Sequence, residues 1–290
     1  MANASGATEF FDTTIADQLI PEIWSKYVIR AREQKLCFAR LATRKYEDDL
    51  SYGDLIRVPQ VQHLNARTKN LAANTAVLFE TDTSTAVQIT IGTWSYVAMA
   101  VETATAKQSY KDIIELYAPE MGYALALAVD DSLAALVASF GTNVVGSMGS
   151  MPTYEQFLEA RRLLNDANVP RKGRVGVFSP MAEEGFLQLD QFVRNDYSKI
   201  QGSKDDDDDM GYVGSWFGIP IYVSTNVAGD NTAGHDNTVM HSESIACCMQ
   251  MEPTTHRWLD INYLANKVVT EQLYGVKEMR DDHAVWFKAA

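Results

Sequence analysis

The stretch PEMGYALALAVDDSLAALVASF, from Pro119 to Phe140, carries the clearest structural signal in the sequence. Its larger apolar residues recur at spacings of four, four, three and four, which places them on one face of an α-helix. Pro119 suits the first turn of such a helix, and Gly141 suits the position just after its end. The pattern predicts a helix of roughly 33 Å, at about 1.5 Å per residue. Its expected core residues are Leu125, Val129, Leu133 and Leu136.

Upstream of this helix, residues 46–106 have the composition of β-strands. Val87, Ile89 and Ile91 alternate with Gln88 and Thr90, which is the period-two pattern of a strand. The segment NARTKNLAANTAVLFETDTST, residues 65–85, is polar and lacks a dense apolar set. We therefore expect a long two-stranded arm that has to pack on something else, because an isolated hairpin is only marginally stable in water.

Helices and strands are also predicted on both sides of these two features. An extended start followed by helical spacing at residues 23–41 predicts an N-terminal arm and helix. After a glycine-rich break at 144–152, the capping-box pair Thr153 and Gln156 predicts another helix. GRVGVFSP (173–180) predicts a strand that leads into a helix, GIPIYVS (218–224) predicts a second strand, and residues 255–290 predict further short strands. The fold class is therefore expected to be α+β.

Composition and charge exclude several classes of protein. The 290 residues are 46% hydrophobic and 22% charged, which is ordinary for an ordered globular protein. A net charge of −13 argues against a protein whose main task is to grip nucleic-acid phosphates. The first residues lack a signal-peptide pattern, and the longest apolar run is too short to cross a bilayer. Three cysteines, two of them adjacent, suit reduced thiols, so we expect a soluble cytosolic product with no membrane partner.

Motifs that carry catalysis were not found. The sequence has no HExxH pair, no GxSxG elbow, no phosphate-binding loop and no dinucleotide-binding turn. His235 and His241 lie near Asp230 and Asp236 in a segment rich in glycine and asparagine, which is more typical of a loop than of a metal site. We expect no catalytic residue, no cofactor and no dedicated metal site.

Five consecutive aspartates form the most unusual short stretch: Asp205, Asp206, Asp207, Asp208 and Asp209. Cation-binding loops alternate carboxylates with spacers and a glycine, whereas five consecutive side chains diverge and repel one another. A solvated, mobile loop is the favoured interpretation. The other interpretation is a weak cation site, formed where copies from neighbouring subunits converge.

The order of the elements resembles the major capsid proteins of tailed bacteriophages, which have the HK97-like fold. Within that fold it is most similar to a coat protein family with short motifs at matching places. Here these are Tyr46-Glu47, Gly53-Asp54, Gln108-Ser109, Asp130, and the strand residues Gly218, Pro220, Tyr222 and Ser224. The likeness covers most of the chain, and the order and spacing of the motifs carry it rather than any one of them.

The resemblance implies an HK97-like capsid fold with an extended N-terminal arm, a β-hairpin E-loop, a long spine helix, and peripheral and axial domains. It implies the following division: 1–45, N-terminal arm and helix; 46–106, E-loop and base strands; 107–151, spine helix of the peripheral domain; 152–249, axial domain; 250–290, C-terminal strands returning to the peripheral domain. Expected inter-subunit contacts are Arg57, Arg67, Lys69, Glu80 and Asp82. Some relatives crosslink through a lysine and an asparagine, but Lys69 and Asn70 do not match that motif, so no crosslink is expected.

The resemblance also implies the function. Many copies, as hexamers and pentamers, would close into an icosahedral shell around double-stranded phage DNA, which is packaged without sequence-specific binding. The expected partners are a separate scaffolding protein, a portal protein and, as a further candidate, a decoration protein. The expected location is the virion capsid, after synthesis in the cytoplasm of a bacterial host.

Two rival hypotheses remain open at this point. An encapsulin-like nanocompartment keeps the fold and changes the cargo from DNA to protein. A metal-dependent hydrolase would use the aspartate run with His235 and His241. Particle contents separate the first rival from a phage shell, and deletion of Asp205–Asp209 tests the second.

Overall fold

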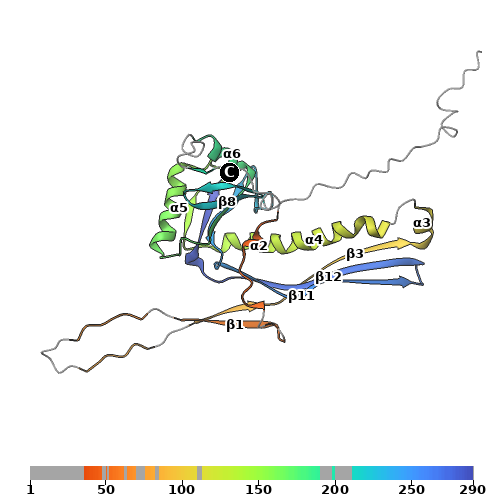
Figure 1. The fold of residues 1–290 in the computed structure, drawn as a ribbon, viewed down its shortest axis with the longest axis horizontal. Coiled ribbons are helices and arrows are strands. Elements are labelled where there is room, and N and C mark those ends of the chain that lie inside the picture. Colours follow the sequence, from red (N-terminus) through yellow and green to blue (C-terminus); the bar gives the residue numbers. More distant parts are fainter. Residues whose placement is uncertain are drawn as a thin grey trace, which may run out of the picture. The chain divides into compact units, whose positions relative to one another are not determined.

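A computed structural model describes residues 36–47, 50, 52–61, 64–69, 76–81, 85–109, 113–189, 198–199 and 211–289 (Figure 1). Its helices are α2 (Phe38–Leu41), α3 (Thr103–Gln108), α4 (Ile113–Ala135), α5 (Tyr154–Asp166) and α6 (Pro180–Leu187), with 3₁₀ turns η2 (Leu136–Ser139) and η4 (Asp281–His283). Its strands are β1 (Leu55–Gln60), β2 (Thr85–Thr90), β3 (Thr93–Glu102), β4 (Val144–Gly146), β5 (Arg174–Phe178), β6 (Ser198–Lys199), β7 (Tyr212–Trp216), β8 (Ile219–Val223), β9 (Gly229–Asp230), β10 (Gly234–His241), β11 (Ile245–Asp260), β12 (Ala265–Glu278) and β13 (Ala284–Ala289). The aspartate run, Asp82 and the N-terminal arm lie outside the described residues.

The strands form three sheets. An eight-stranded mixed sheet has the order β4-β13-β10-β5-β8-β7-β6, with β9 paired to β10. A three-stranded antiparallel sheet has the order β11-β12-β3, and β1 and β2 form a separate antiparallel pair. The expected C-terminal segment 250–290 contributes to two sheets, because β12 pairs with β3 whereas β13 pairs with β10 and β4.

The long helix begins earlier than its sequence pattern predicts. α4 is continuous from Ile113 to Ala135 and contains Pro119, so the prediction that Pro119 opens the helix is wrong. A proline inside a helix forfeits the hydrogen bond to the carbonyl four residues earlier, here that of Glu115. Glu115 and Pro119 are both exposed, so water can bond to that carbonyl and the helix tolerates the proline. At the other end, the α-helix gives way to the 3₁₀ turn η2 before Phe140.

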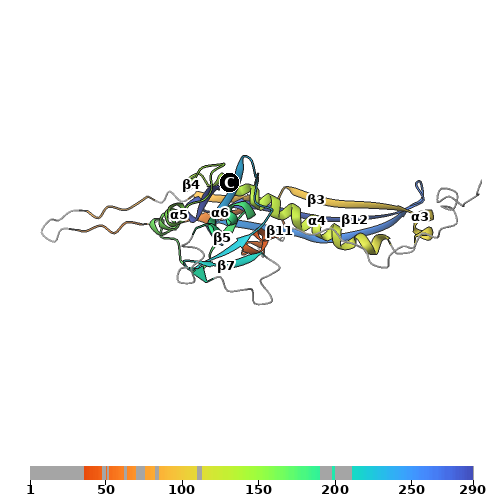
Figure 2. The same cartoon turned by 90° about the horizontal axis from the view of Figure 1, so that it is seen from above.

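One face of α4 packs against the three-stranded sheet (Figures 1 and 2). Two side chains of β12 bond to the helix backbone: Gln272 Nε2 donates to the Leu125 carbonyl at 2.9 Å, and the Tyr274 hydroxyl donates to the Ala128 carbonyl at 3.0 Å. In the described part of the chain, the segment from Ile113 to Ser139 is the one helix long and apolar enough to cross a membrane by length and composition alone. Core helices pass the same test, and these contacts account for its apolar face.

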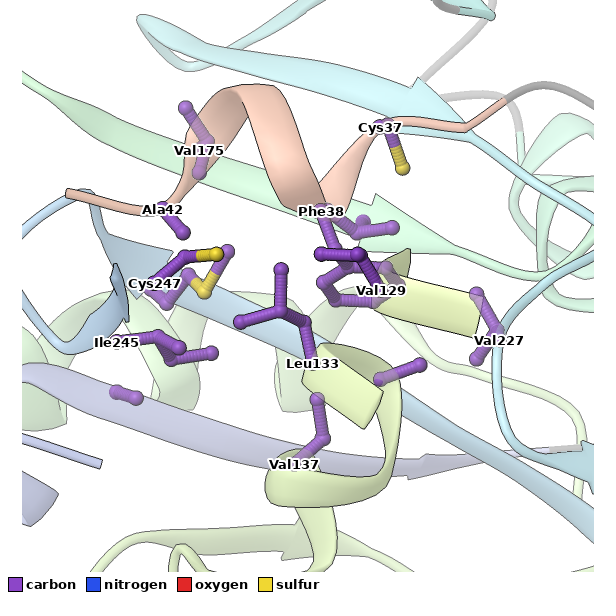
Figure 3. Packing of buried hydrophobic residues seen from close by; sticks show 14 of the residues in the cluster. Cys37, Phe38, Ala42, Val129, Leu133, Val137, Val175, Val227, Ile245 and Cys247 are labelled. Atoms are coloured by element: carbon purple, nitrogen blue, oxygen red, sulfur yellow. The ribbon is translucent and has the colours of Figure 1, made fainter. Parts of the chain in front are cut away.

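The main core lies where α4 meets α2, β5 and β11 (Figure 3). Leu133 is fully buried among Phe38 of α2, Val175 of β5 and Ile245 of β11. Leu125 and Val129 are also buried, whereas Leu136 is only partly buried and packs against the same cluster. The helix face read from the sequence is therefore the face that the tertiary structure covers.

A second core fills the space between α5, α6 and the eight-stranded sheet. Thr153 and Gln156 form the predicted capping box at the start of α5, and Phe157, Ala160 and Leu164 are buried along its inner face. Ser179 caps α6, and the β7–β8 hairpin turns through Phe217 and Gly218, both with positive φ. Gly214 lies inside β7, where its φ is not positive.

Candidate interaction surfaces

The base of the two-stranded arm is anchored in the rest of the chain. β1 and β2 pair in register from Leu55 opposite Thr90 to Gln60 opposite Thr85. Ile89 of β2 is fully buried in a small core with Leu50, Ile91, Cys248 and Met279. Beyond this pair, the described residues 64–69 and 76–81 form no strand and extend away from the base (Figure 1).

The arm exposes apolar side chains that nothing in the described chain covers. The exposed fraction of these side chains runs from 63% to 89%, and Phe79 is the most exposed. The arm surface consists of Val61, Leu64, Val77, Leu78 and Phe79. Apolar residues gathered on a segment without a core mark an interaction site in a soluble protein.

Two charged residues of the arm pair with each other. Arg67 Nη2 lies 3.4 Å from Glu80 Oε1, and the Asn65 backbone N–H donates to Glu80 Oε2 at 3.1 Å. We expected Arg67 and Glu80 to find their partners on neighbouring subunits, but each has a partner within this chain, because the two halves of the arm run side by side. Arg57 and Lys69 are exposed and have no ion-pair partner in the described part of the chain.

A second surface lies on the face of the three-stranded sheet opposite α4. Neighbouring residues of a strand point to opposite faces, and Gln272 and Tyr274 point to α4. Leu273 and Glu271 therefore face away from the helix, together with their cross-strand partners Trp94 and Tyr96. Leu273 packs against the small core at the base of the arm. We call the rest of this face the sheet surface, and it comprises Trp94, Tyr96, Trp258, Val269 and Glu271.

Glu271 organises the polar part of the sheet surface. It accepts a hydrogen bond from Trp94 Nε1 at 3.0 Å through Oε2, and its Oε1 lies 3.3 Å from His256 Nε2. The ring of Trp94 is thereby held in place while 68% of its surface stays exposed. An aromatic ring held in this way loses little further side-chain freedom when a partner covers it.

The tip of the β11–β12 hairpin is also apolar and exposed. Leu259, Ile261, Tyr263 and Leu264 each expose more than half of their surface. The tip is fixed from within by Lys267, whose Nζ lies 2.6 Å from Asp260 Oδ2. The hydrogen bond from Lys267 lowers the pKa of Asp260, which favours its charged carboxylate form.

The residues considered for a metal site do not converge. Asp230 accepts hydrogen bonds from the backbone N–H groups of Thr232 and Ala233, and Asp236 accepts one from Trp286 Nε1. His235 bonds to Asn231. Within the described residues, no group of three or more His, Cys, Asp or Glu side chains is placed to hold a metal ion.

Asp130 has a structural role that its place in the sequence motif did not reveal. It is buried, accepts from the Ala39 backbone N–H at 2.8 Å and accepts from Asn226 Nδ2 at 2.9 Å. Burial raises the pKa of this carboxyl, which the two hydrogen bonds oppose. Asp130 thus joins α4 to α2 and to the loop after β8. In the sequence, the one sign of this role was an aspartate on an otherwise apolar helix face.

Comparisons with known proteins identify the fold. No family model and no curated protein matches the chain. Solved structures match the chain along most of its length. A structure from Mycobacterium phage Che8 matches with 22% sequence identity and a TM-score of 0.76, over 97% of this chain and 98% of that one. The capsid of the Cyanophage P-SCSP1u matches with 17% identity and a TM-score of 0.72 over 100% and 97%. The mature capsid of bacteriophage PhiM1 matches with 14% identity and a TM-score of 0.68 over 93% and 92%. The predicted α+β, HK97-like capsid fold is confirmed.

Proposed function

We propose that this chain is the major capsid protein of a tailed bacteriophage and that many copies assemble into an icosahedral shell around double-stranded DNA. The observation that carries the proposal is the arm surface, because its apolar residues have no core inside their own subunit. A fold shared along nearly the whole chain with phage capsid subunits supports the same conclusion. The full-length match favours a shell over a hydrolase built on the aspartate run.

The arm surface and the sheet surface suggest how neighbouring subunits meet. We infer that the arm of one subunit lies across the sheet surface of the next, where Phe79 and Leu78 would cover Trp94 and Tyr96. Stable interfaces bury about 1,200–2,000 Å² in total, so the arm and the sheet surface together would have to bury an area of this order. Arg57 and Lys69 are the candidate inter-subunit ion-pair residues, and Arg67, Glu80 and Asp82 stay with them as predicted inter-subunit contacts.

The domain division is part of the proposal. The spine helix α4 with β3, β11 and β12 would form the peripheral domain, and the eight-stranded sheet with α5 and α6 would form the axial domain. The sheet pairings support assigning β4 and β13 to the axial domain, although the sequence places them outside residues 152–249.

The finer parts of the function follow from the shell. We propose a purely structural, non-enzymatic role in the virion after synthesis in the host cytoplasm. A separate scaffolding protein, a portal protein, packaged DNA and a decoration protein would be the partners. A net charge of −13 suits a container that must release DNA, since each tight phosphate contact would have to be broken during ejection.

Electron microscopy of the purified protein, expressed alone and with its scaffolding protein, tests the proposal. Two deletions sharpen it: one removes residues 62–84 of the arm, and the other removes Asp205–Asp209. The arm deletion should leave a folded subunit by circular dichroism but form no shells, whereas the aspartate deletion should still form shells. Only monomers or small oligomers under every condition would overturn the proposal. Shells that contain protein cargo instead of DNA would favour the encapsulin-like rival.

A further inference from the structure

Two buried histidines meet where the chain crosses between its two larger sheets. His241 ends β10 and His283 ends η4, and their ring centroids lie 5.9 Å apart at an interplanar angle of 84°. Residues 242–244 lead from the eight-stranded sheet into β11, and residues 279–283 lead back from β12 into β13. The two crossings touch, since the Ser244 carbonyl accepts from the Met279 N–H at 2.8 Å and from the Arg280 N–H at 3.4 Å.

The hydrogen bonds of His241 require a neutral ring. The Glu243 backbone N–H donates to His241 Nδ1 at 3.2 Å, so Nδ1 carries a lone pair. His241 Nε2 donates to the Lys172 carbonyl at 3.0 Å, which fixes the remaining proton on Nε2. Protonation would put a second N–H on Nδ1, directly against the N–H of Glu243, and would break the bond that shapes the first crossing.

His283 is in a similar position. Its Nε2 accepts from Arg280 Nη1 at 3.5 Å, and its Nδ1 is buried without a hydrogen-bond partner in the described chain. A proton added at Nε2 would face the guanidinium of Arg280. Both rings are therefore compatible with the observed packing only in their neutral forms.

The charged groups around the pair do not offset a positive charge on both rings. Asp282 Oδ2 lies 4.0 Å from His283 Nε2 and is about half exposed, and Glu243 is already paired with Lys45. Asp281 bonds to the Thr142 N–H through Oδ2, and its Oδ1 is buried without a hydrogen-bond partner among the described residues. On β5, opposite His241, Arg174 adds a further positive charge and donates to the carbonyls of Pro170, Leu164 and Val169.

Burial lowers the pKa of His283; Arg280 and His241 lower it as well, while Asp282 and Glu243 act in the opposite direction. A lowered histidine pKa means that the unfolded chain takes up the proton first. The stability that the neutral ring provides is therefore complete above the ordinary pKa of 6.5 and is lost as the pH falls below it.

The base of the arm lies next to the same crossings. A cavity of about 280 Å³ is lined by Val58 and Val87 of the arm base, by Lys45, and by Glu243 and Arg280 of the crossings. A change in the crossings would therefore reach the arm through direct neighbours.

We propose that His241 and His283 form an acid-sensitive junction that holds the eight-stranded sheet, the three-stranded sheet and the arm base in their present arrangement. The junction is closed while both rings are neutral, and it loosens when they are protonated. This inference rests on the subunit structure alone and stands whether or not the chain forms shells.

Hydrogen–deuterium exchange of the full-length subunit at pH 7.5 and pH 5.0, corrected for intrinsic exchange, tests the junction. Peptides covering 241–246 and 278–284 should lose protection at least tenfold at pH 5.0, whereas peptides from α5 should not. The double variant His241→Asn/His283→Gln should show no such pH-dependent loss. His256→Gln is the matched control, because His256 is an exposed histidine that pairs with Glu271 and should leave the loss unchanged.

Equal protection of the wild-type junction at both pH values would overturn the proposal. A pH-dependent loss that persists unchanged in the double variant would also overturn it. If the double variant does not fold, the single variant His283→Gln is measured at a series of pH values between 7.5 and 5.0. The pH at which half of the junction's protection is lost has to differ from that of the wild type. An unchanged pH midpoint counts against the proposal.

Discussion

Replacement of Phe79 by serine tests whether a neighbouring subunit covers the arm surface. Phe79 is 89% exposed in the isolated subunit, so its removal should change the free energy of unfolding by no more than about 0.5 kcal/mol. Burial of a phenylalanine side chain contributes about 1.5–3 kcal/mol. If each subunit places one Phe79 on its neighbour, assembly should lose about 2 kcal/mol per subunit. Since 1.4 kcal/mol corresponds to a factor of ten, the critical subunit concentration should rise about 30-fold.

The assay has two parts. Light scattering and sedimentation over a series of subunit concentrations give the assembly threshold, and urea unfolding of the unassembled subunit gives its stability. Phe79→Leu is the matched control, because leucine keeps most of the apolar surface and should raise the threshold by less than about threefold. A Phe79→Ser variant that assembles at the wild-type threshold with unchanged stability would show that the side chain stays exposed in the assembly and would contradict this prediction.

Three further outcomes are expected. Leu133→Ala should lower the free energy of unfolding by about 2–5 kcal/mol because of the cavity that it leaves. Each kcal/mol should lower the Tm of the subunit by about 2–4 °C. An unchanged Tm would contradict the packing of the α4 face. Arg67→Glu should impair assembly with little change in Tm, because exposed ion pairs contribute about 0–1 kcal/mol, and adding Glu80→Arg should restore assembly. Failure to restore it would place the essential partner of Arg67 on another subunit. Burial raises the pKa of Cys247 and of Cys248 to about 11. Iodoacetamide at pH 8 should therefore label these thiols only after unfolding, and mass spectrometry measures the labelling. Rapid labelling of the native protein would contradict their burial.

Local elements could be predicted because their signals lie within a few residues. The apolar face of α4, the capping box at Thr153 and the strand that leads into the Ser179 cap all follow from spacings of four residues or fewer. The boundary at Pro119 could not be predicted in this way. A proline ends a helix only when the freed carbonyl has no other partner, and whether that carbonyl meets water depends on exposure in the folded chain.

The candidate surfaces were only half predictable. The sequence indicates an arm without a core of its own, but it does not indicate that Arg67 pairs with Glu80, because thirteen positions separate them and their distance depends on how the two halves of the arm align. The sheet surface was not predicted, since strand alternation gives two faces without saying which face α4 covers. The contacts of Gln272 and Tyr274 with the helix decide that question.

The amino-acid sequence was sufficient to predict the α+β class, the long apolar helix, the arm and, through the order of short motifs, the likeness to phage capsid proteins. Only the tertiary structure placed β13 in the eight-stranded sheet, joined Asp130 to Ala39 and Asn226, and brought His241 against His283. The difference arises from the sequence range over which each interaction acts. Helix and strand periodicity follows from hydrogen bonds between near neighbours, whereas these contacts join residues 42 to 96 positions apart and form only when the sheets and α4 pack together.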